Sequence, residues 1–178
     1  MNAIRTLSVA GGLAACLAMP LGVRAEEVTL KDAKHAVEAI KKADPGQEKF
    51  IDHAAGYAVF PSVAKGGLVV GGAGGAGFLF VNGKAVGKTT LSQVTVGAQV
   101  GGQAYYEIIY FETAEAVAAF KKGQWTMAAQ VSAVALSSGA SANAKYKEGV
   151  AVFTLTKGGA MAEASIGGQK FSYEPMGG

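Results

Sequence analysis

Glycines crowd one short stretch of this chain, between segments rich in strand-forming residues. Glycine inside a strand weakens it, and the usual compensation is a β-bulge, a tight bend or the close approach of another backbone or a ligand. The stretch therefore predicts a strongly coiled antiparallel sheet or a small barrel. With 178 residues, 26 of them glycine and 50% hydrophobic, the chain fits one domain. The crowded glycines are Gly71, Gly72, Gly74, Gly75 and Gly77.

Short runs of strand-forming residues, broken by glycine, predict the rest of the sheet. Asn82-Gly83 after an aromatic run is the strongest hairpin signal, because both residues tolerate the positive φ angles of a tight turn. The first six runs predict an antiparallel meander, and three more follow later in the chain. The expected strands are residues 57–60, 68–70, 78–81, 85–91, 94–100, 105–111, 130–136, 150–156 and 160–166.

Helical patterns interrupt these strands at two places. Residues 28–43 show apolar positions three and four apart, and Asp44-Pro45-Gly46 ends that pattern, with a short second helix expected over 47–55. Residues 113–122 have a threonine cap, an early acid, late lysines and a following glycine. We expect residues 137–144 to form a surface loop. The fold class predicted is α+β, with an N-terminal helix and a short internal helix on the coiled sheet.

The first 25 residues resemble a secretory signal. Arg5 precedes an uncharged run, and Val23 and Ala25 form a small-residue site for cleavage after Ala25. Residues 13–16 also resemble a lipobox ending in Cys16, which would be acylated as a lipid attachment site. We expect residues 26–178 to form a single exported domain, periplasmic or, in the alternative, anchored to the outer membrane as a lipoprotein.

Charge and cysteine usage exclude several classes of function. Without residues 1–25 the net charge is near +1, which does not suit a phosphate-tracking nucleic-acid binder. One cysteine forms no internal disulfide and no cysteine-rich metal site. We therefore expect no nucleic-acid partner, no metal and no cofactor.

Three catalytic-looking motifs fail on their context. Gly72-x-Gly74-x-x-Gly77 precedes a strand rather than a helix, so it does not indicate a dinucleotide site. Gly87-Lys88-Thr89 lacks the first glycine of a phosphate loop, and Ser62-x-x-Lys65 lacks the companion motifs of penicillin-recognising enzymes. His35 and His53 lack zinc-helix spacing and are expected on helix surfaces. We expect no enzyme.

Glu107 interrupts residues 105–111, a strand that is apolar on both faces. A carboxyl group there must be paired or have a raised pKa. The sequence favours a structural partner, a lysine or a tyrosine hydroxyl, over a catalytic role.

Several glycine-containing blocks, in order, resemble the SYLF domain over roughly residues 30–175. They are Gly56-Tyr57-Ala58-Val59-Phe60-Pro61, Lys65-x-Gly67, Gly71-Gly72-x-x-Gly75-x-Gly77, Gly97-x-Gln99-x-Gly101, and the run from Lys157 to Ser165 with Gly167-Gly168. The resemblance implies a non-catalytic lipid-binding module of an exported bacterial branch. Eukaryotic SYLF relatives bind phosphoinositides and, in fungi, actin. Residues 26–53 are net acidic here, so lipid binding carries over as a class and those named ligands do not.

Two sets of lysines are candidates for binding phospholipid. In the first, the N-terminal helix lies in the headgroup plane with its apolar stripe inward and with Lys34, Lys41 and Lys42 toward anionic phosphates. The competing interpretation, which we favour, is that the apolar stripe (Leu30, Ala33, Val37 and Ile40) covers the sheet.

The second set is Lys65, Lys84 and Lys88, expected around the glycine-rich meander near the Asn82-Gly83 turn. The competing interpretation is an ordinary solvated hairpin. Membrane phospholipids are the expected partners. The rival function is an envelope structural or assembly protein that binds other envelope proteins through a sheet edge.

Overall fold

The computed structural model describes residues 27–66, 70–96, 103–123, 125–158 and 166–177. The predicted signal segment, Cys16 and residues 160–165 of the last expected strand lie outside these ranges. The helices are α1 (Leu30–Ala43), α2 (Gln47–His53) and α3 (Ala114–Lys121), with a 3₁₀ helix η1 (Ala140–Asn143). The strands are β1 (Gly56–Gly66), β2 (Val70–Val81), β3 (Lys84–Val96), β4 (Gln103–Phe111), β5 (Trp125–Thr126), β6 (Val134–Ala135), β7 (Val150–Thr156) and β8 (Lys170–Pro175).

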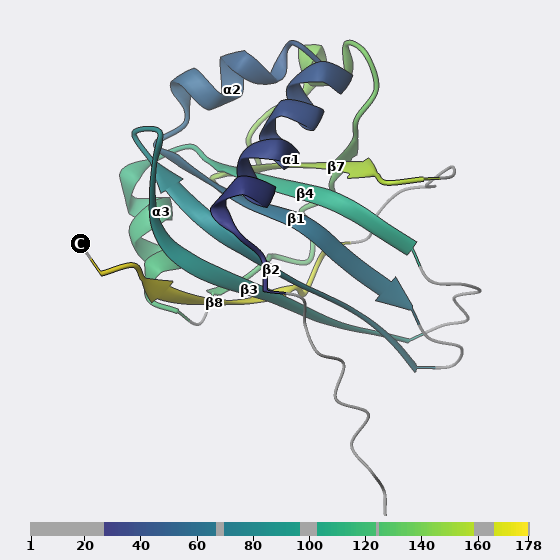
Figure 1. The fold of residues 1–178 in the computed structure, drawn as a ribbon. Coiled ribbons are helices and arrows are strands. Elements are labelled where there is room, and N and C mark those ends of the chain that lie inside the picture. The colour runs from purple at the N-terminus through teal and green to yellow at the C-terminus, as the bar shows by residue number, and fades with distance from the viewer. Residues whose placement is uncertain (1–26, 67–69, 97–102, 124, 159–165, 178) are drawn as a thin grey trace, which may run out of the picture.

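One curled sheet of eight strands organises the molecule (Figure 1). Its order is β5-β8-β3-β2-β1-β4-β7-β6, and every pairing is antiparallel except that of β6 with β7. Helices α1 and α2 lie over one face of this sheet in Figure 1. The predicted α+β class, with an N-terminal helix on a coiled and mainly antiparallel sheet, is confirmed.

The expected meander is confirmed for β1, β2 and β3. Asn82 and Gly83 form the turn between β2 and β3 with φ of 50° and 71°, which is the backbone region the sequence predicted for them. Strand β4 does not continue the meander, because it pairs with β1, placing Tyr110 opposite Tyr57. The free side of β3 pairs instead with β8.

The glycines of β2 let neighbouring backbone approach closely. A Cβ at Gly77 would overlap the carbonyl oxygen of Val59, and one at Gly75 would lie 2.7 Å from that of Ser62. The β1–β2 register shifts between Val59 and Ser62, the mark of a bulge. A bulge with a close strand approach bends the sheet. These glycines therefore allow the coiling that the sequence predicted from them.

Alternate residues of β1 belong to two apolar clusters, one on each face of the sheet. Ala58 and Phe60 lie in the cluster enclosed by the curl, with residues of α3 and β8. Tyr57 and Val59 lie in the other cluster, which α1 and α2 cover. The sheet is therefore buried on both faces over its central strands.

Local signals account for both longer helices. Thr29 and Asp32 form a capping box at the start of α1, where the Thr29 N–H donates to Asp32 Oδ2 at 2.9 Å and the Asp32 N–H donates to Thr29 Oγ1 at 3.3 Å. The Ala116 N–H donates to the Thr113 hydroxyl at 3.2 Å at the start of α3. Among the described residues, none of the helices combines the length and apolar character needed to cross a membrane.

Two expectations for the second half of the chain need correction. The strand expected over residues 130–136 is only Val134–Ala135, which pairs in parallel with part of β7. Residues 137–144 are not a simple surface loop, because they contain η1 and bury Ser141. Strand β8 was not predicted, and the strand expected over 160–166 stays a prediction because residues 160–165 lie outside the described ranges.

Candidate functional site

The apolar stripe of α1 packs on the sheet. Ala33, Ala36 and Ile40 are 0% exposed and lie in one cluster with Phe78 and Ile108. Leu30 and Val37, the other apolar positions of the stripe, are partly buried against the same cluster. The structure therefore favours the interpretation in which this stripe covers the sheet, and leaves the lysine-bearing side of α1 outward.

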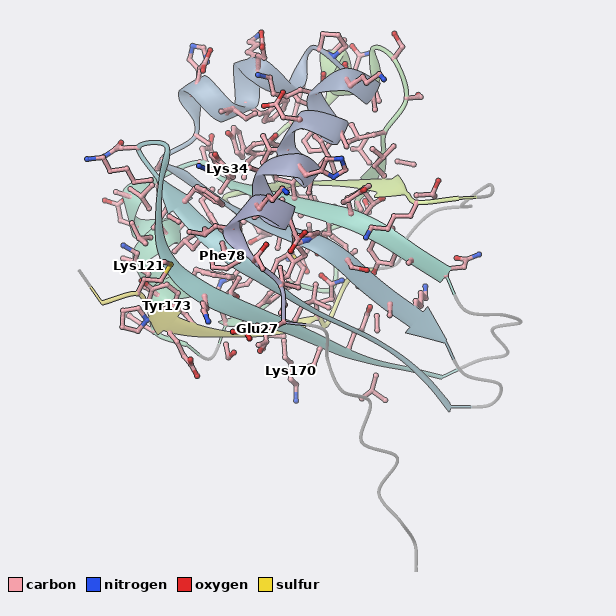
Figure 2. The ribbon with its side chains drawn as sticks, in the orientation of Figure 1. Glu27, Lys34, Phe78, Lys121, Lys170 and Tyr173 are labelled. Carbon is pink, nitrogen blue, oxygen red and sulfur yellow. The ribbon has the colours of Figure 1, made fainter. Side chains whose placement is uncertain are left out.

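Lys34 and Lys42 are exposed on the outward side of α1, together with Lys31. Neither Lys34 nor Lys42 forms a salt bridge with any residue that the structure describes. Lys41 differs, because its Nζ lies 3.0 Å from Glu48 Oε1, and this hydrogen bond raises the pKa of Lys41. Figure 2 labels Lys34 on α1. Of the three predicted helix lysines, two remain available to an external anion.

The structure does not bring Lys65, Lys84 and Lys88 together. Lys65 pairs in register with Ala73 near one end of β2, and Lys84 pairs with Val81 at the other end. Ala73 and Val81 are eight residue steps apart along the strand, roughly 26 Å. Lys88 lies between these positions on β3, with its Nζ 3.8 Å from Glu27 Oε1. The expected cluster near the hairpin turn is therefore dispersed along the sheet.

Glu107 is fully buried on β4, inside the curl of the sheet. Its Oε2 accepts a hydrogen bond from Gln169 Nε2 at 3.1 Å, while its Oε1 has no partner among the described residues. Burial raises the pKa of Glu107 to about 7, against the opposing effect of the Gln169 hydrogen bond. Both outcomes that the sequence allowed occur together, a raised pKa and a hydrogen-bonding partner, and the partner is an amide rather than the expected lysine or tyrosine hydroxyl. Neighbouring Thr154 is also buried, with its hydroxyl unpartnered within the described chain.

The residues of the catalytic-looking motifs do not assemble into a reactive site. Ser62 and Lys65 both lie on β1, where a spacing of three puts side chains on opposite faces. His35 is exposed on α1, and His53 Nδ1 lies 2.7 Å from the Lys49 carbonyl oxygen. No group of three or more histidine, cysteine or acidic side chains suited to a metal occurs in the described residues.

A hollow that the sequence analysis missed lies between α2 and residues 139–146. Its volume is about 720 Å³. Asp44, which the sequence identified only as a helix stop, is buried beside it and accepts hydrogen bonds from the backbone N–H groups of Gly46, Gly139 and Ser141. Burial acts to raise the pKa of Asp44, but the bonds from Ser141, Gly46 and Gly139 outweigh it and lower that pKa. The spacing of 95 residues between Asp44 and Gly139 explains why no local pattern revealed this contact.

A second hollow of about 920 Å³ lies between the start of α1 and the outer face of β1 and β2. Its lining has charges of both signs, with Asp32 and Glu27 near His35 and Lys157. The Lys157 Nζ is 4.8 Å from the centre of the Tyr106 ring, a cation–π contact. This lysine therefore already has a partner within the domain.

Comparison with known proteins gives two matches. Residues 92–175 match the family described as Ysc84, Las17-binding protein actin regulator. Beta cell expansion factor A of Aeromonas veronii is 31% identical over 153 residues, which cover 80% of this chain and 58% of that protein. This chain thus spans less than two thirds of that relative's length. These matches show a SYLF (Ysc84) family domain in this chain.

Proposed function

We propose that this SYLF domain is a non-catalytic module that binds anionic phospholipid of the bacterial cell envelope. The observation that carries the proposal is the orientation of α1. Its apolar stripe is buried against the sheet, so Lys34 and Lys42 face solvent without an ion pair among the described residues. Membership of the SYLF family supports the same class of ligand.

This arrangement predicts adsorption to a membrane surface rather than insertion of the helix. Ile40 is 0% exposed, and removing it from the core to reach lipid would sacrifice the burial that holds α1 to the sheet. Lysines near an anionic surface contribute about 1 kcal/mol each, and salt screens that attraction. Binding should therefore depend on anionic lipid and fall as salt rises.

We also propose that the domain acts in the periplasm, or at the outer membrane if Cys16 is acylated. The layout of residues 1–25 supports export. The intact mass of the mature protein distinguishes the two forms. A start at Glu26 without added mass means a soluble periplasmic protein, and a lipid increment on Cys16 means an anchored one.

Co-sedimentation with vesicles tests the proposal. The variant Lys34→Gln/Lys42→Gln should weaken binding to vesicles containing anionic lipid by about 30-fold, the effect of two lysines at about 1 kcal/mol each. Lys121→Gln/Lys122→Gln is the matched control, because it removes the same charge from exposed positions at the end of α3, where Figure 2 labels Lys121. Equal binding of both variants, or no binding to any vesicle, would contradict the proposal.

The rival function is envelope assembly through a sheet edge, with other envelope proteins as partners. The ends of the described sheet are β5 and β6, each two residues long, so they offer few backbone groups for an added strand. The vesicle experiment separates the two functions, because an assembly protein of this kind needs neither anionic lipid nor Lys34 and Lys42.

A further inference from the structure

The hollow beside α2 has the size and the walls of a ligand site. Its volume of about 720 Å³ falls within the range of roughly 300–1,000 Å³ that is usual for small-molecule pockets. Helix α2 forms one wall through Lys49, Phe50 and His53, and residues 139–146 form the facing wall. These walls come from distant parts of the chain, and neither could form the pocket alone.

Hydrogen bonds to Asp44 hold the two walls in place. The Asp44 carboxylate follows α1 and accepts the Ser141 N–H at 2.7 Å, the Gly139 N–H at 3.3 Å and the Gly46 N–H at 3.1 Å. Charge-assisted bonds of this kind are stronger than neutral ones. They satisfy the carboxylate within the protein, so the pocket is preformed and Asp44 is not left as an unpaired buried anion.

The interior of the pocket is mainly apolar. The rings of Phe50 and Tyr146 lie 5.6 Å apart at 58°, and Phe50 continues into the core through Phe153 at 5.0 Å. Ala142 and Ala144 add small apolar side chains to the facing wall. A hydrocarbon chain fits this lining, because it gains from leaving water and needs no hydrogen bonds.

Two exposed lysines lie at this pocket without a salt bridge among the described residues. They are Lys49 and Lys145, and His53 is beside them. The lining also has two carboxylates: Glu112, and Asp44, whose oxygens accept three backbone N–H groups. Burial, with Glu112 nearby, raises the pKa of Tyr146, so its hydroxyl stays protonated and can donate to an anion. Lys49, Lys145 and the Tyr146 hydroxyl thus offer donors to an anionic head beside an apolar lining.

We propose that this pocket binds a single-chain anionic amphiphile, a fatty-acid carboxylate. Its alkyl chain lies against Phe50 and Tyr146, and its carboxylate lies between Lys49 and Lys145. This goes beyond adsorption to a bilayer, because the ligand is one molecule taken from solution into a pocket rather than a membrane surface. It also uses different lysines from the outward face of α1.

Titration of the full chain with decanoate and dodecanoate, both kept below the concentrations at which they form micelles, tests the proposal by calorimetry. Binding should saturate at one site, and dodecanoate should bind about 15-fold more tightly than decanoate, about fourfold for each added CH₂. The neutral 1-decanol should bind more weakly than decanoate. Absence of saturation, or equal affinity for the two chain lengths, would overturn the proposal.

Variants of the lining residues test whether decanoate binds in this pocket. Ala142→Phe fills the space, and Lys49→Gln/Lys145→Gln removes the cations; each should reduce decanoate affinity on the order of 100-fold. Glu112→Gln should tighten binding, because it removes the opposing charge. Lys121→Gln/Lys122→Gln is the control and should bind like the unmodified chain. All these positions, Ala142 included, are exposed, and the charge variants keep the test independent of whether Ala142→Phe folds.

The same variants separate this proposal from phospholipid adsorption. Lys49→Gln/Lys145→Gln should lose decanoate while vesicle binding persists through Lys34 and Lys42. Lys34→Gln/Lys42→Gln should show the reverse. If decanoate affinity is unchanged in Ala142→Phe and in Lys49→Gln/Lys145→Gln, the pocket is not its site, whatever the vesicle result.

Discussion

Glu107 is a fully buried carboxyl group whose ionisation is changed by its surroundings. It lies on β4 between apolar neighbours, and its one described hydrogen-bond donor is Gln169 on the approach to β8. Burial raises its pKa to about 7, compared with 4.5 for an ordinary glutamate. The folded protein therefore holds a proton that the unfolded chain releases at lower pH, which links stability to pH.

The stability of the folded state should fall as pH rises from 4.5 to about 7. Below 4.5 both states hold the proton; between the two pKa values only the folded state does, so each rise in pH favours unfolding. The free energy of unfolding should drop on the order of 3 kcal/mol across this window. Urea unfolding at a series of pH values measures it. Glu107→Gln should remove most of the slope, and an unchanged slope in that variant would contradict the assignment.

The lysines show what residue patterns can and cannot predict. Helical periodicity correctly separated the buried stripe of α1 from Lys34 and Lys42, because both follow from one local repeat. The closeness of Lys65, Lys84 and Lys88 was predicted from sequence proximity and was wrong, because strand register decides where each lies along the sheet. The hydrogen-bond partner of Glu107 was likewise not predictable, because Gln169 lies 62 residues further along the chain.

At the scale of elements, β2 can pair closely with β1 because glycines of β2 leave room for the β1 backbone. Gly77 lies where a methyl group would overlap the Val59 carbonyl. A Cβ added at Gly74, in the same strand, would lie 3.7 Å from the Leu91 carbonyl oxygen, which is an ordinary van der Waals contact. The two glycines therefore differ in what they allow, although the sequence presents them alike.

Alanine substitutions in β2 should separate these two roles. Gly77→Ala should destabilise the protein by about 3 kcal/mol, because backbone cannot move aside as a flexible side chain does. Gly74→Ala should be close to neutral, since the strand gains a better former and meets no clash. Thermal or urea unfolding of both variants measures the difference. Equal destabilisation would show that close strand approach is not what Gly77 provides.

The elements that were predicted correctly carry their sequence signals, such as caps and turn residues, within or next to the element itself. Helix α3 has its cap at Thr113 and its basic end at Lys121, and the β2–β3 turn has Asn82-Gly83. Strand β8 was missed because its pairing depends on the edge of β3 and on Trp125 of β5, not on a pattern of its own. A short edge strand is defined largely by the backbone it meets.

Across the whole molecule, two apolar layers share one sheet. Ile40 of α1 packs on one face, while Trp125 packs on the other with Phe111, Phe120 and Phe171. Because the same central strands separate both layers, we expect the domain to unfold as one cooperative unit.

Ile40→Ala should lower stability by about 2–5 kcal/mol, the usual cost of a cavity in a core. The transition followed by fluorescence of Trp125, the chain's single tryptophan, should shift as far as that followed by circular dichroism, although Trp125 lies on the opposite face. Lys42→Ala, at an exposed position of α1, is the control. A shift seen only by circular dichroism would mean that the layers unfold independently.

From the amino-acid order alone came the α+β class, the helices and the β2–β3 hairpin, because caps, periodicity and turn glycines act between residues a few positions apart. The folded chain alone decided that β4 returns to β1, that β8 closes onto β3, and that Asp44 joins residues 139–141 to build a pocket. Those arrangements depend on backbone groups brought together from distant segments, and no local pattern specifies which partner a buried carboxylate or an open strand edge will meet.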